Sequence, residues 1–296
     1  MHPWDASGWV TVDGVDVHVC RGTRPGPRAV ITGGIHGDEY EGPVAALELV
    51  RTLRAEEISG TVAVVPVANP GAVAAGTRAS PADGGNLARS FPGNVDGNET
   101  ERLAAGLFAW MRHASFAIDL HSGGVEYDFA PLGGFYGAPA AGNPSFEAAQ
   151  RFGLPYLWAL PPTPGVLSNA LWDLGIPVVG CEYRGCGRLD AGGVEAYAEG
   201  VRSCLRHWGV LVGVAGPPQG RVVTGDWQLA STTGFFIAEK VLGDTVQASE
   251  TIAHIVDPRG NETQRFCAPH DGLVLALRSK AFITEGSWGV LSVKHA

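Results

Sequence analysis

Three side chains in the sequence are of types that together bind a metal ion. His36 and Glu39 lie three residues apart in a glycine-rich segment, and His121 follows much later in the chain. Two imidazoles and one carboxylate are the protein ligands of catalytic zinc sites that keep the fourth position open for water. Zinc makes that water a nucleophile at neutral pH. The residues therefore predict one zinc ion (Zn2+) per chain and a hydrolytic reaction.

The predicted elements around these residues could bring them to one place. A strand predicted at residues 29–31 ends at a glycine pair, and the tight turn that follows aims His36 and Glu39 at one point. Residues 115–120 are predicted to form a buried strand, so His121 leaves its carboxyl end, where open α/β sheets place their ligands. The alternative is that all three are ordinary polar residues near turns, with Glu39 a solvated carboxylate at a helix start.

Four groups of residues resemble, in this order, the motifs of the succinylglutamate desuccinylase/aspartoacylase family, which belongs to the zinc carboxypeptidase superfamily. They are GGIHGDE at residues 33–39, NPGA at 69–72 with GTR at 76–78, RSFPG at 89–93, and DLHSGG at 119–124. The segment after residue 215 is also similar to the β-rich C-terminal domain of such deacylases. The resemblance implies a mixed α/β zinc hydrolase that removes an acyl group from the nitrogen of an amino acid or a related small molecule.

Further residues should complete a hydrolytic site, because amide hydrolysis needs a base for the water and a proton donor for the leaving amine. Glu182 is the candidate, since it follows a strand predicted at residues 176–181 and precedes a glycine-containing turn at the same sheet edge. The family places its catalytic glutamate in such a context. The alternative is an exposed carboxylate at a strand end. Tyr127 and Tyr136 should line the pocket, with core packing as their alternative.

The resemblance gives roles to two arginines. Arg78 matches the family arginine that faces the developing oxyanion, and Arg89 matches the one that grips a substrate carboxylate as a bidentate fork. Ordinary surface arginines are the alternative. Asp119 lies two residues before His121 on the predicted strand, so the two side chains share a face and Asp119 could orient the imidazole.

One position departs from the family pattern. Relatives carry an asparagine immediately before the second arginine, whereas this chain has Ala88, with Asn86 two residues earlier. Losing one hydrogen bond to a charged ligand removes about 1.5–3 kcal/mol, which is enough to change substrate preference without abolishing metal chemistry. Asn86 could bind the substrate instead, or the substrate could be a different anion or a lactam-like precursor.

The first part of the chain predicts a three-layer α/β domain. Two β-branched runs around Asp13 and Gly14 indicate an antiparallel hairpin at its start. Buried strands then alternate with helices expected near residues 99–112 and 193–208, as in a sheet covered on both faces. Residues 1–214 should form this mixed-sheet, zinc carboxypeptidase-like catalytic domain.

The segment at residues 215–220 is rich in proline and glycine and indicates a domain boundary. Residues 215–296 contain short strands separated by glycines, which resemble the barrel-sandwich pattern of biotinyl and lipoyl carriers. Such a carrier needs a lysine at a hairpin tip, and Lys240 lies in no Met-Lys pair. A smaller all-β domain with a structural or substrate-gating role is therefore expected.

Charge and composition narrow the partners. The formal net charge is −9 with no basic stretch, which argues against nucleic acid or an anionic membrane. The first residues lack the pattern of a signal peptide, and no apolar run approaches the length of a membrane span. Five scattered cysteines fit reduced thiols better than a disulfide framework. We expect a cytoplasmic protein; the sequence leaves open whether it forms a homo-oligomer.

The sequence thus predicts a zinc-dependent deacylase that hydrolyses the amide bond of a small N-acylated substrate, such as an N-acyl amino acid. A peptide carboxypeptidase would use the same metal and glutamate, but it needs a dependable clamp for a C-terminal carboxylate, and Ala88 counts against one. A non-catalytic metal-binding interaction protein is the other alternative. The intact set of candidate ligands and base counts against it.

Overall fold

The computed structural model describes residues 3–295. The α-helices are α1 (Glu41–Thr52), α2 (Pro70–Ala75), α3 (Glu99–Met111), α4 (Pro144–Phe152), α5 (Leu167–Trp172) and α6 (Ala191–His207), and the 3-10 turns are η1 (Pro3–Asp5), η2 (Ala55–Glu57) and η3 (Leu87–Arg89). No helix within residues 3–295 combines the length and the hydrophobicity needed to cross a membrane.

The strands of the first part of the chain are β1 (Gly8–Val12), β2 (Val15–Arg21), β3 (Arg24–Thr32), β4 (Ser59–Val65), β5 (Phe116–Leu120), β6 (Tyr127–Phe135), β7 (Tyr156–Ala159) and β8 (Val178–Gly185). Those that follow are β9 (Arg221–Thr224), β10 (Trp227–Leu229), β11 (Gly234–Ala238), β12 (Thr245–Val246), β13 (Thr251–Val256), β14 (Glu262–Cys267), β15 (Gly272–Arg278), β16 (Phe282–Ile283) and β17 (Trp288–His295).

A large mixed sheet runs through the molecule in the order β1-β2-β4-β3-β5-β8-β6-β7-β9-β17-β15-β12. The β1–β2 hairpin turns at Asp13 and Gly14, which both have positive φ, as its sequence predicts. In the middle of the sheet, β3, β5 and β8 are parallel neighbours, so their carboxyl ends lie side by side. The prediction of a mixed α/β fold is confirmed.

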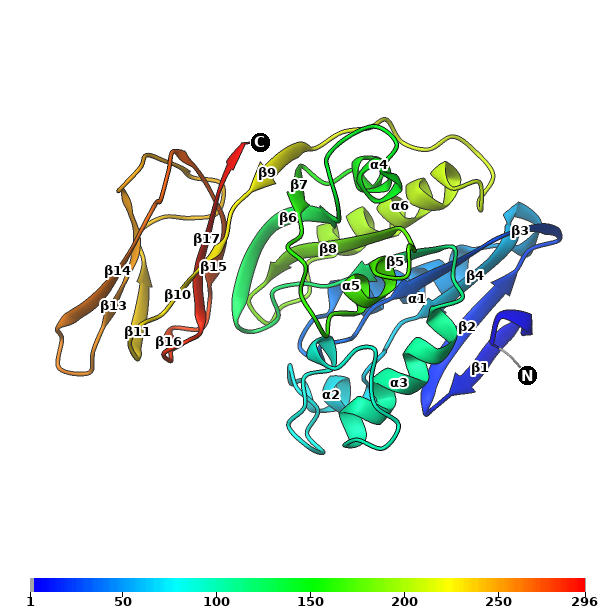
Figure 1. Cartoon of the computed structure of the whole chain (residues 1–296), viewed down its shortest axis with the longest axis horizontal. Helices are drawn as coiled ribbons and strands as arrows, with labels where there is room; N and C mark the ends of the chain where they lie inside the picture. The colour runs from blue at the N-terminus through cyan, green and yellow to red at the C-terminus, as the bar shows by residue number, and fades with distance from the viewer. Residues whose placement is uncertain (1–2, 296) are drawn as a thin grey trace.

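Helices lie on both faces of this sheet (Figure 1). One buried cluster joins the strands to α1, α4 and α6, and includes Leu49, Phe152 and Tyr197. A second cluster, on the opposite face, joins them to α3 and α5 and includes Leu107 and Leu171. Because apolar side chains pack on both of their faces, the central strands are rigid supports for the loops that follow their carboxyl ends.

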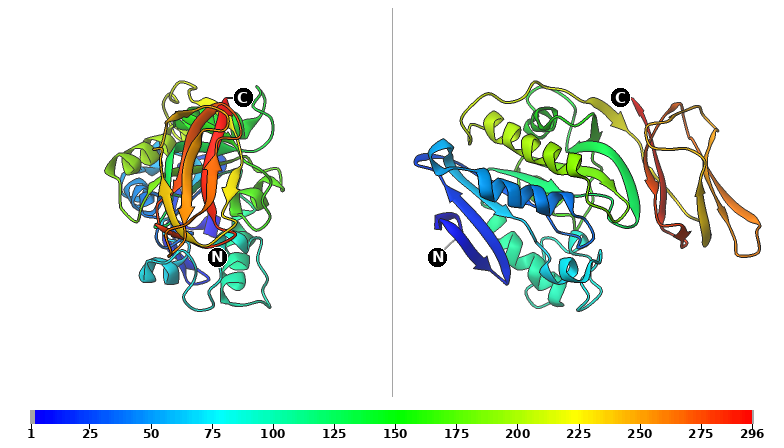
Figure 2. Two further views of the ribbon diagram at one scale, coloured as in Figure 1. Left: turned by 90° about the vertical axis from the view of Figure 1, so that its left-hand side faces the viewer. Right: turned by 180° about the vertical axis from the view of Figure 1, so that it is seen from behind.

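The strands β10 to β17 form one end of the elongated molecule in the views of Figures 1 and 2, whereas β9 lies beside β7. The second sheet, ordered β14-β13-β11-β16, packs on β12, β15 and β17 through a core that includes Phe236, Phe266 and Val290. The pairings β6–β7, β7–β9, β9–β17, β17–β15 and β15–β6 also close a ring of strands. The C-terminal strands are therefore hydrogen-bonded into the main sheet, a continuity that the sequence does not predict.

Candidate active site

The loop after β3 carries His36 and Glu39, and contacts with neighbouring segments hold this loop in place. An added Cβ at Gly37 would lie 2.0 Å from the carbonyl oxygen of Ala72, so only glycine fits there. The Gly37 amide donates to the carbonyl of Thr77 at 2.9 Å. The segments at residues 69–72 and 76–78 thus brace the loop that carries the two candidate ligands.

The carboxylate of Glu39 is the centre of the site. It is buried, and its Oε1 lies 2.7 Å from Nδ1 of His36 and accepts a hydrogen bond from Arg78 at 3.1 Å. Its Oε2 lies 2.9 Å from Nδ1 of His121 and accepts one from the Ser122 amide at 3.1 Å. The structure therefore brings together all three of the predicted metal ligands, with Arg78 beside them.

The other ring nitrogens of the two histidines face hydrogen-bond acceptors. Nε2 of His36 lies 3.1 Å from Oδ1 of Asn86, and Nε2 of His121 lies 3.2 Å from Oδ2 of Asp119. Asp119 is itself held by the hydroxyl of Thr32, which donates to its Oδ1 at 2.6 Å. When both Nε2 atoms carry the proton, the Nδ1 lone pairs are free, and such second contacts orient metal-binding imidazoles. The Asp119 contact that the sequence suggests is present.

The donor set fits a cation. One ligand atom from each of His36, Glu39 and His121 lies within 4.8 Å of the others. Burial lowers the pKa of His121, but the carboxylates of Asp119 and Glu39 outweigh it, so the pKa lies well above its usual value. Burial raises the pKa of Glu39, yet the two imidazoles bring it well below its usual value. The buried carboxylate thus needs positive charge beside it, which the protonated His121 imidazole supplies without a metal and which a cation bound to the three ligand atoms would supply instead.

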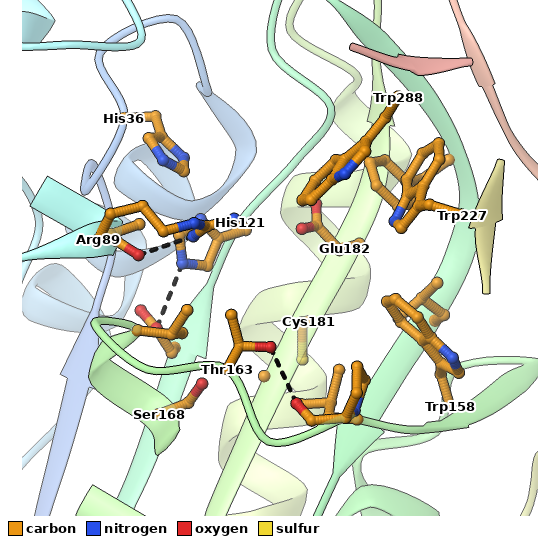
Figure 3. Close-up of a pocket in the computed structure, with 18 of the residues that line it drawn as sticks. His36, Arg89, His121, Trp158, Thr163, Ser168, Cys181, Glu182, Trp227 and Trp288 are labelled. Carbon is orange, nitrogen blue, oxygen red and sulfur yellow. Dashed lines mark hydrogen bonds and ion pairs between the residues drawn. The ribbon is translucent and has the colours of Figure 1, made fainter. Parts of the chain in front are cut away.

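Glu182 lies on the neighbouring strand. The parallel pairing of β5 with β8 puts Leu120 opposite Cys181, so Glu182 stands next to His121 at the sheet edge. Its Oε2 is buried and has no hydrogen-bond partner among residues 3–295. Burial, with the negative charge of Glu39, raises the pKa of Glu182 to about 8. Figure 3 shows this carboxyl group between the histidines and a group of tryptophans.

A cavity of about 170 Å³ opens beside these groups. The polar residues of its lining include the candidate ligands His36 and His121 together with Arg78, Arg89 and Glu182. Most of the remaining lining is apolar; these residues are Ala88, Phe129, Leu132, Trp158, Leu160, Pro161, Val166, Trp227 and Trp288. The cavity is therefore polar next to the candidate metal ligands and apolar over most of its remaining lining.

The predicted substrate-binding residues take different places. Arg89 lines the cavity, with its guanidinium 5.8 Å from the ring of Trp288. Tyr136 also lines it, and its hydroxyl lies 3.0 Å from the hydroxyl of Ser168. Tyr127 is not among the lining residues; its ring lies beneath the guanidinium of Arg78 at 6.0 Å.

Asn86 is next to the cavity but is not among its lining residues. Its Oδ1 caps η3 by accepting from the Ala88 amide at 2.9 Å and also faces Nε2 of His36. Ala88 does line the cavity, where it presents a methyl group. The side-chain oxygen of Asn86 thus contacts the Ala88 amide and His36, and the assignment of Asn86 to substrate binding stays a prediction.

The tryptophans of the cavity are residues that sequence reasoning missed. Trp158 comes from β7, whereas Trp227 and Trp288 come from β10 and β17, in the C-terminal part of the chain. No local motif marks them, because they meet through pairings between distant strands. The change to short strands after residue 220 was the only signal that this part of the chain could contribute to the site.

The comparisons with known proteins agree on one family of deacylases. Residues 25–208 match the Succinylglutamate desuccinylase/Aspartoacylase catalytic domain. The N-alpha-acetyl-L-2,4-diaminobutyric acid deacetylase of Halomonas elongata is 34% identical, over 95% of this chain and 86% of that protein.

Solved structures are similar over nearly the whole chain. The product-bound ectoine utilization protein EutE (DoeB) from Ruegeria pomeroyi has a TM-score of 0.87 and 31% identity, covering 95% of this chain and 89% of its own. A succinylglutamate desuccinylase/aspartoacylase from Rhodobacter sphaeroides has a TM-score of 0.86 and 29% identity, covering 95% and 88%. The similarity includes the C-terminal strands as well as the catalytic part.

The contacts of His121 predict its role in metal binding. His121→Ala removes one of three ligands, so we expect the purified variant to lose bound zinc, measured by elemental analysis after dialysis. His113→Ala is the matched control, because His113 is exposed and precedes β5, at the opposite end of the strand from His121. Full zinc occupancy in His121→Ala would contradict this ligand set.

The raised pKa of Glu182 predicts a pH dependence of stability in the metal-free protein. In the folded state the carboxyl group keeps its proton up to a pKa of about 8, whereas in the unfolded chain it loses the proton near a pKa of 4.5. The contribution of Glu182 to the free energy of unfolding is thus fully present below the pKa of the unfolded state and is lost as the pH rises through the pKa of the folded state. Glu182→Gln cannot lose a proton, so its melting temperature should exceed that of the parent increasingly from pH 5 to 9. A constant difference would refute the raised pKa.

Proposed function

Because the chain belongs to the succinylglutamate desuccinylase/aspartoacylase family, we propose that it is a zinc-dependent deacylase of small N-acyl amino acids or similar amides. The observation that carries the proposal is the Glu39 carboxylate between two imidazoles, with a carboxyl oxygen of Glu182 at the same sheet edge that has no hydrogen-bond partner among residues 3–295. The relatives named as deacetylase and desuccinylase support hydrolysis of an N-acyl group.

We assign the metal to His36, Glu39 and His121. When bound there, zinc supplies Lewis acidity and lowers the pKa of water. The choice of zinc rests on the ligand types, since two histidines and a carboxylate are typical of its hydrolytic sites. Asn86 and Asp119 would keep the two imidazoles in the tautomer that leaves Nδ1 free.

The chain's own residues would then move the proton and the charge. Glu182 takes a proton from the attacking water and passes it to the nitrogen of the leaving amine, so that the amide C–N bond breaks and a carboxylate and an amine are released. Positive charge nearby lowers the pKa of a carboxyl group. A bound cation would therefore bring the pKa of Glu182 down from about 8 toward neutral pH. Arg78 donates to the oxygen on which negative charge develops.

Arg89 would hold the anionic end of the substrate. It lines the cavity next to Ala88, so the clamp has a guanidinium but lacks the amide that relatives add. The small volume of the cavity, which two tryptophans of the C-terminal strands help to line, favours a small molecule over an extended peptide.

We also propose that residues 1–214 are a three-layer, zinc carboxypeptidase-like catalytic domain and that residues 215–296 are a smaller barrel-sandwich-like domain. Helices on both faces of the main sheet and the separate core around Phe266 support this division. A cytoplasmic location, the lack of nucleic-acid or membrane partners, and the oligomeric state stay predictions from sequence.

The direct test is release of a free amine from N-acetyl, N-formyl and N-succinyl amino acids by the zinc-loaded protein. We expect turnover of at least one acyl class, its loss after treatment with a chelator, and its return on adding zinc. Turnover that survives complete removal of metal would contradict the zinc assignment. Cleavage of short peptides with no release from acyl amino acids would favour a carboxypeptidase.

The base assignment predicts a specific variant. Glu182→Gln should bind zinc as the parent does but lower kcat by at least about 100-fold, which is the usual scale of general acid–base catalysis. Zinc content and kcat are measured on the same sample. Near-normal kcat at full zinc occupancy would remove Glu182 from the mechanism.

The clamp assignment predicts a change in substrate binding. Arg89→Ala should lower kcat/KM for an N-acyl amino acid by about 10- to 100-fold, mainly through KM, because a charge-assisted hydrogen bond is lost. The substrate whose carboxylate is converted to a neutral amide should be affected much less. Arg112→Ala, an exposed arginine after α3, is the matched control. Equal losses on the charged and neutral substrates would rule out the clamp.

A further inference from the structure

One side of the cavity is an apolar wall built from three tryptophans. Trp227 and Trp288 are stacked, with ring centroids 5.0 Å apart and planes 12° apart. Phe129 packs edge-on against Trp227 at 5.7 Å, and Trp158, which is buried, comes from the neighbouring strand β7. In Figure 3 the three indoles lie across Glu182 from His36 and Arg89.

The wall is held in place by residues behind it. Tyr127 contacts both stacked rings, at 5.5 Å from Trp227 and 5.9 Å from Trp288. Strand pairing also ties Trp227 to Leu291, so its backbone is part of the sheet. The apolar surface is therefore formed before a substrate arrives, and a fitting group would pack against it with little ordering cost.

The charges around the cavity do not suit a cationic substrate group. Its lining carboxyl groups belong to Asp119, which is bound to His121 and Thr32, and to Glu182, the proposed base. No other carboxylate lines the cavity within the described chain. The face of Trp288 is already approached by the Arg89 guanidinium at 5.8 Å, and a second cation there would be repelled.

We propose that the substrate carries a bulky apolar or aromatic group that packs against Trp158, Trp227 and Trp288, while its carboxylate faces Arg89. This inference rests on the proposed function and specifies its substrate class. The proposed substrate differs from the one in the name of the diaminobutyric acid deacetylase. The free amino group of acetylated diaminobutyric acid would be buried in this cavity without a carboxylate partner. The apolar group could be the side chain of the amino acid or the acyl group, since both present the same surface to the wall.

Four substrates test the proposal with the zinc-loaded protein. N-acetyl-L-phenylalanine puts the ring on the amino acid, N-phenylacetylglycine puts it on the acyl group, N-acetylglycine has no ring, and Nα-acetyl-L-2,4-diaminobutyrate has an ammonium group. We expect kcat/KM for one of the two aromatic substrates to exceed that of N-acetylglycine by at least about 50-fold, given the selectivity of apolar pockets. The better of the two identifies the position of the group.

The result that overturns the proposal is fastest hydrolysis of the diaminobutyrate substrate, with the aromatic ones no better than N-acetylglycine. That result would leave the deacylase function intact. Calorimetric binding of the same four molecules to zinc-loaded Glu182→Gln separates the two claims further. Preferential binding of an aromatic molecule without turnover in the parent would support the wall and refute the deacylase; absence of that binding preference would refute the wall.

Variants of the wall test the residues themselves. Trp158→Leu and Trp227→Leu should reduce the aromatic preference about 10-fold or more, whereas Trp158→Phe keeps a ring and should retain most of it. Trp9→Leu is the matched control, because Trp9 is an exposed tryptophan on β1 and should leave the preference unchanged. Thermal melting checks that each variant is folded. Equal losses on N-acetylglycine and on the aromatic substrate would show that the tryptophans are only structural.

Discussion

The buried carboxylate of Glu39 is the group on which the rest of the site depends. It is 2% exposed, and an unpaired charge at that depth would be costly, so each of its hydrogen-bonding partners supplies a positive or donor group. The imidazoles of His36 and His121, the Arg78 guanidinium and the Ser122 amide all point at its two oxygens. A divalent cation satisfies the same carboxylate and frees the histidines from carrying protons, which is why the geometry suits a metal.

The sheet brings the segments that carry these groups to one edge. β3, β5 and β8 run parallel, so the residues after Thr32, after Leu120 and around Cys181 meet at one edge. Gly37 lets the ligand loop pass against Ala72 at a distance that no side chain would allow. The C-terminal strands then close the site from the far side, because β6 pairs with β8 on one edge and with β15 on the other. The parallel strands β3, β5 and β8 thus position the candidate catalytic groups, whereas the tryptophans that line the cavity come from β7, β10 and β17.

Sequence reasoning succeeds where the chemistry is local. His36 and Glu39 share one turn, and Asp119 and His121 share one strand, so spacing alone relates them; the structure brings both pairs together. It does not foresee contacts that depend on tertiary pairing. Asn86 turns toward His36, a contact between residues fifty positions apart, and Tyr127 lies behind the cavity.

The aromatic wall shows the same limit more strongly. Trp158 and Trp288 are brought to one cavity by strands that pair through β9, and nothing in the sequence around either residue indicates a common partner. The substrate selection that we propose therefore depends on residues with little local sequence signal. The candidate metal ligands, by contrast, lie in motifs short enough to be recognised directly.

Anomalous X-ray diffraction from crystals of the zinc-loaded protein, recorded on both sides of the zinc absorption edge, tests the central claim most directly. We expect one strong anomalous peak per chain, about 2.0–2.2 Å from Nδ1 of His36, Nδ1 of His121 and an oxygen of Glu39. The Nε2 contacts to Asn86 and Asp119 should persist. A zinc-saturated crystal with no peak among these three residues, and with Glu39 still hydrogen-bonded to both imidazoles, would contradict the assignment of this site as the metal centre.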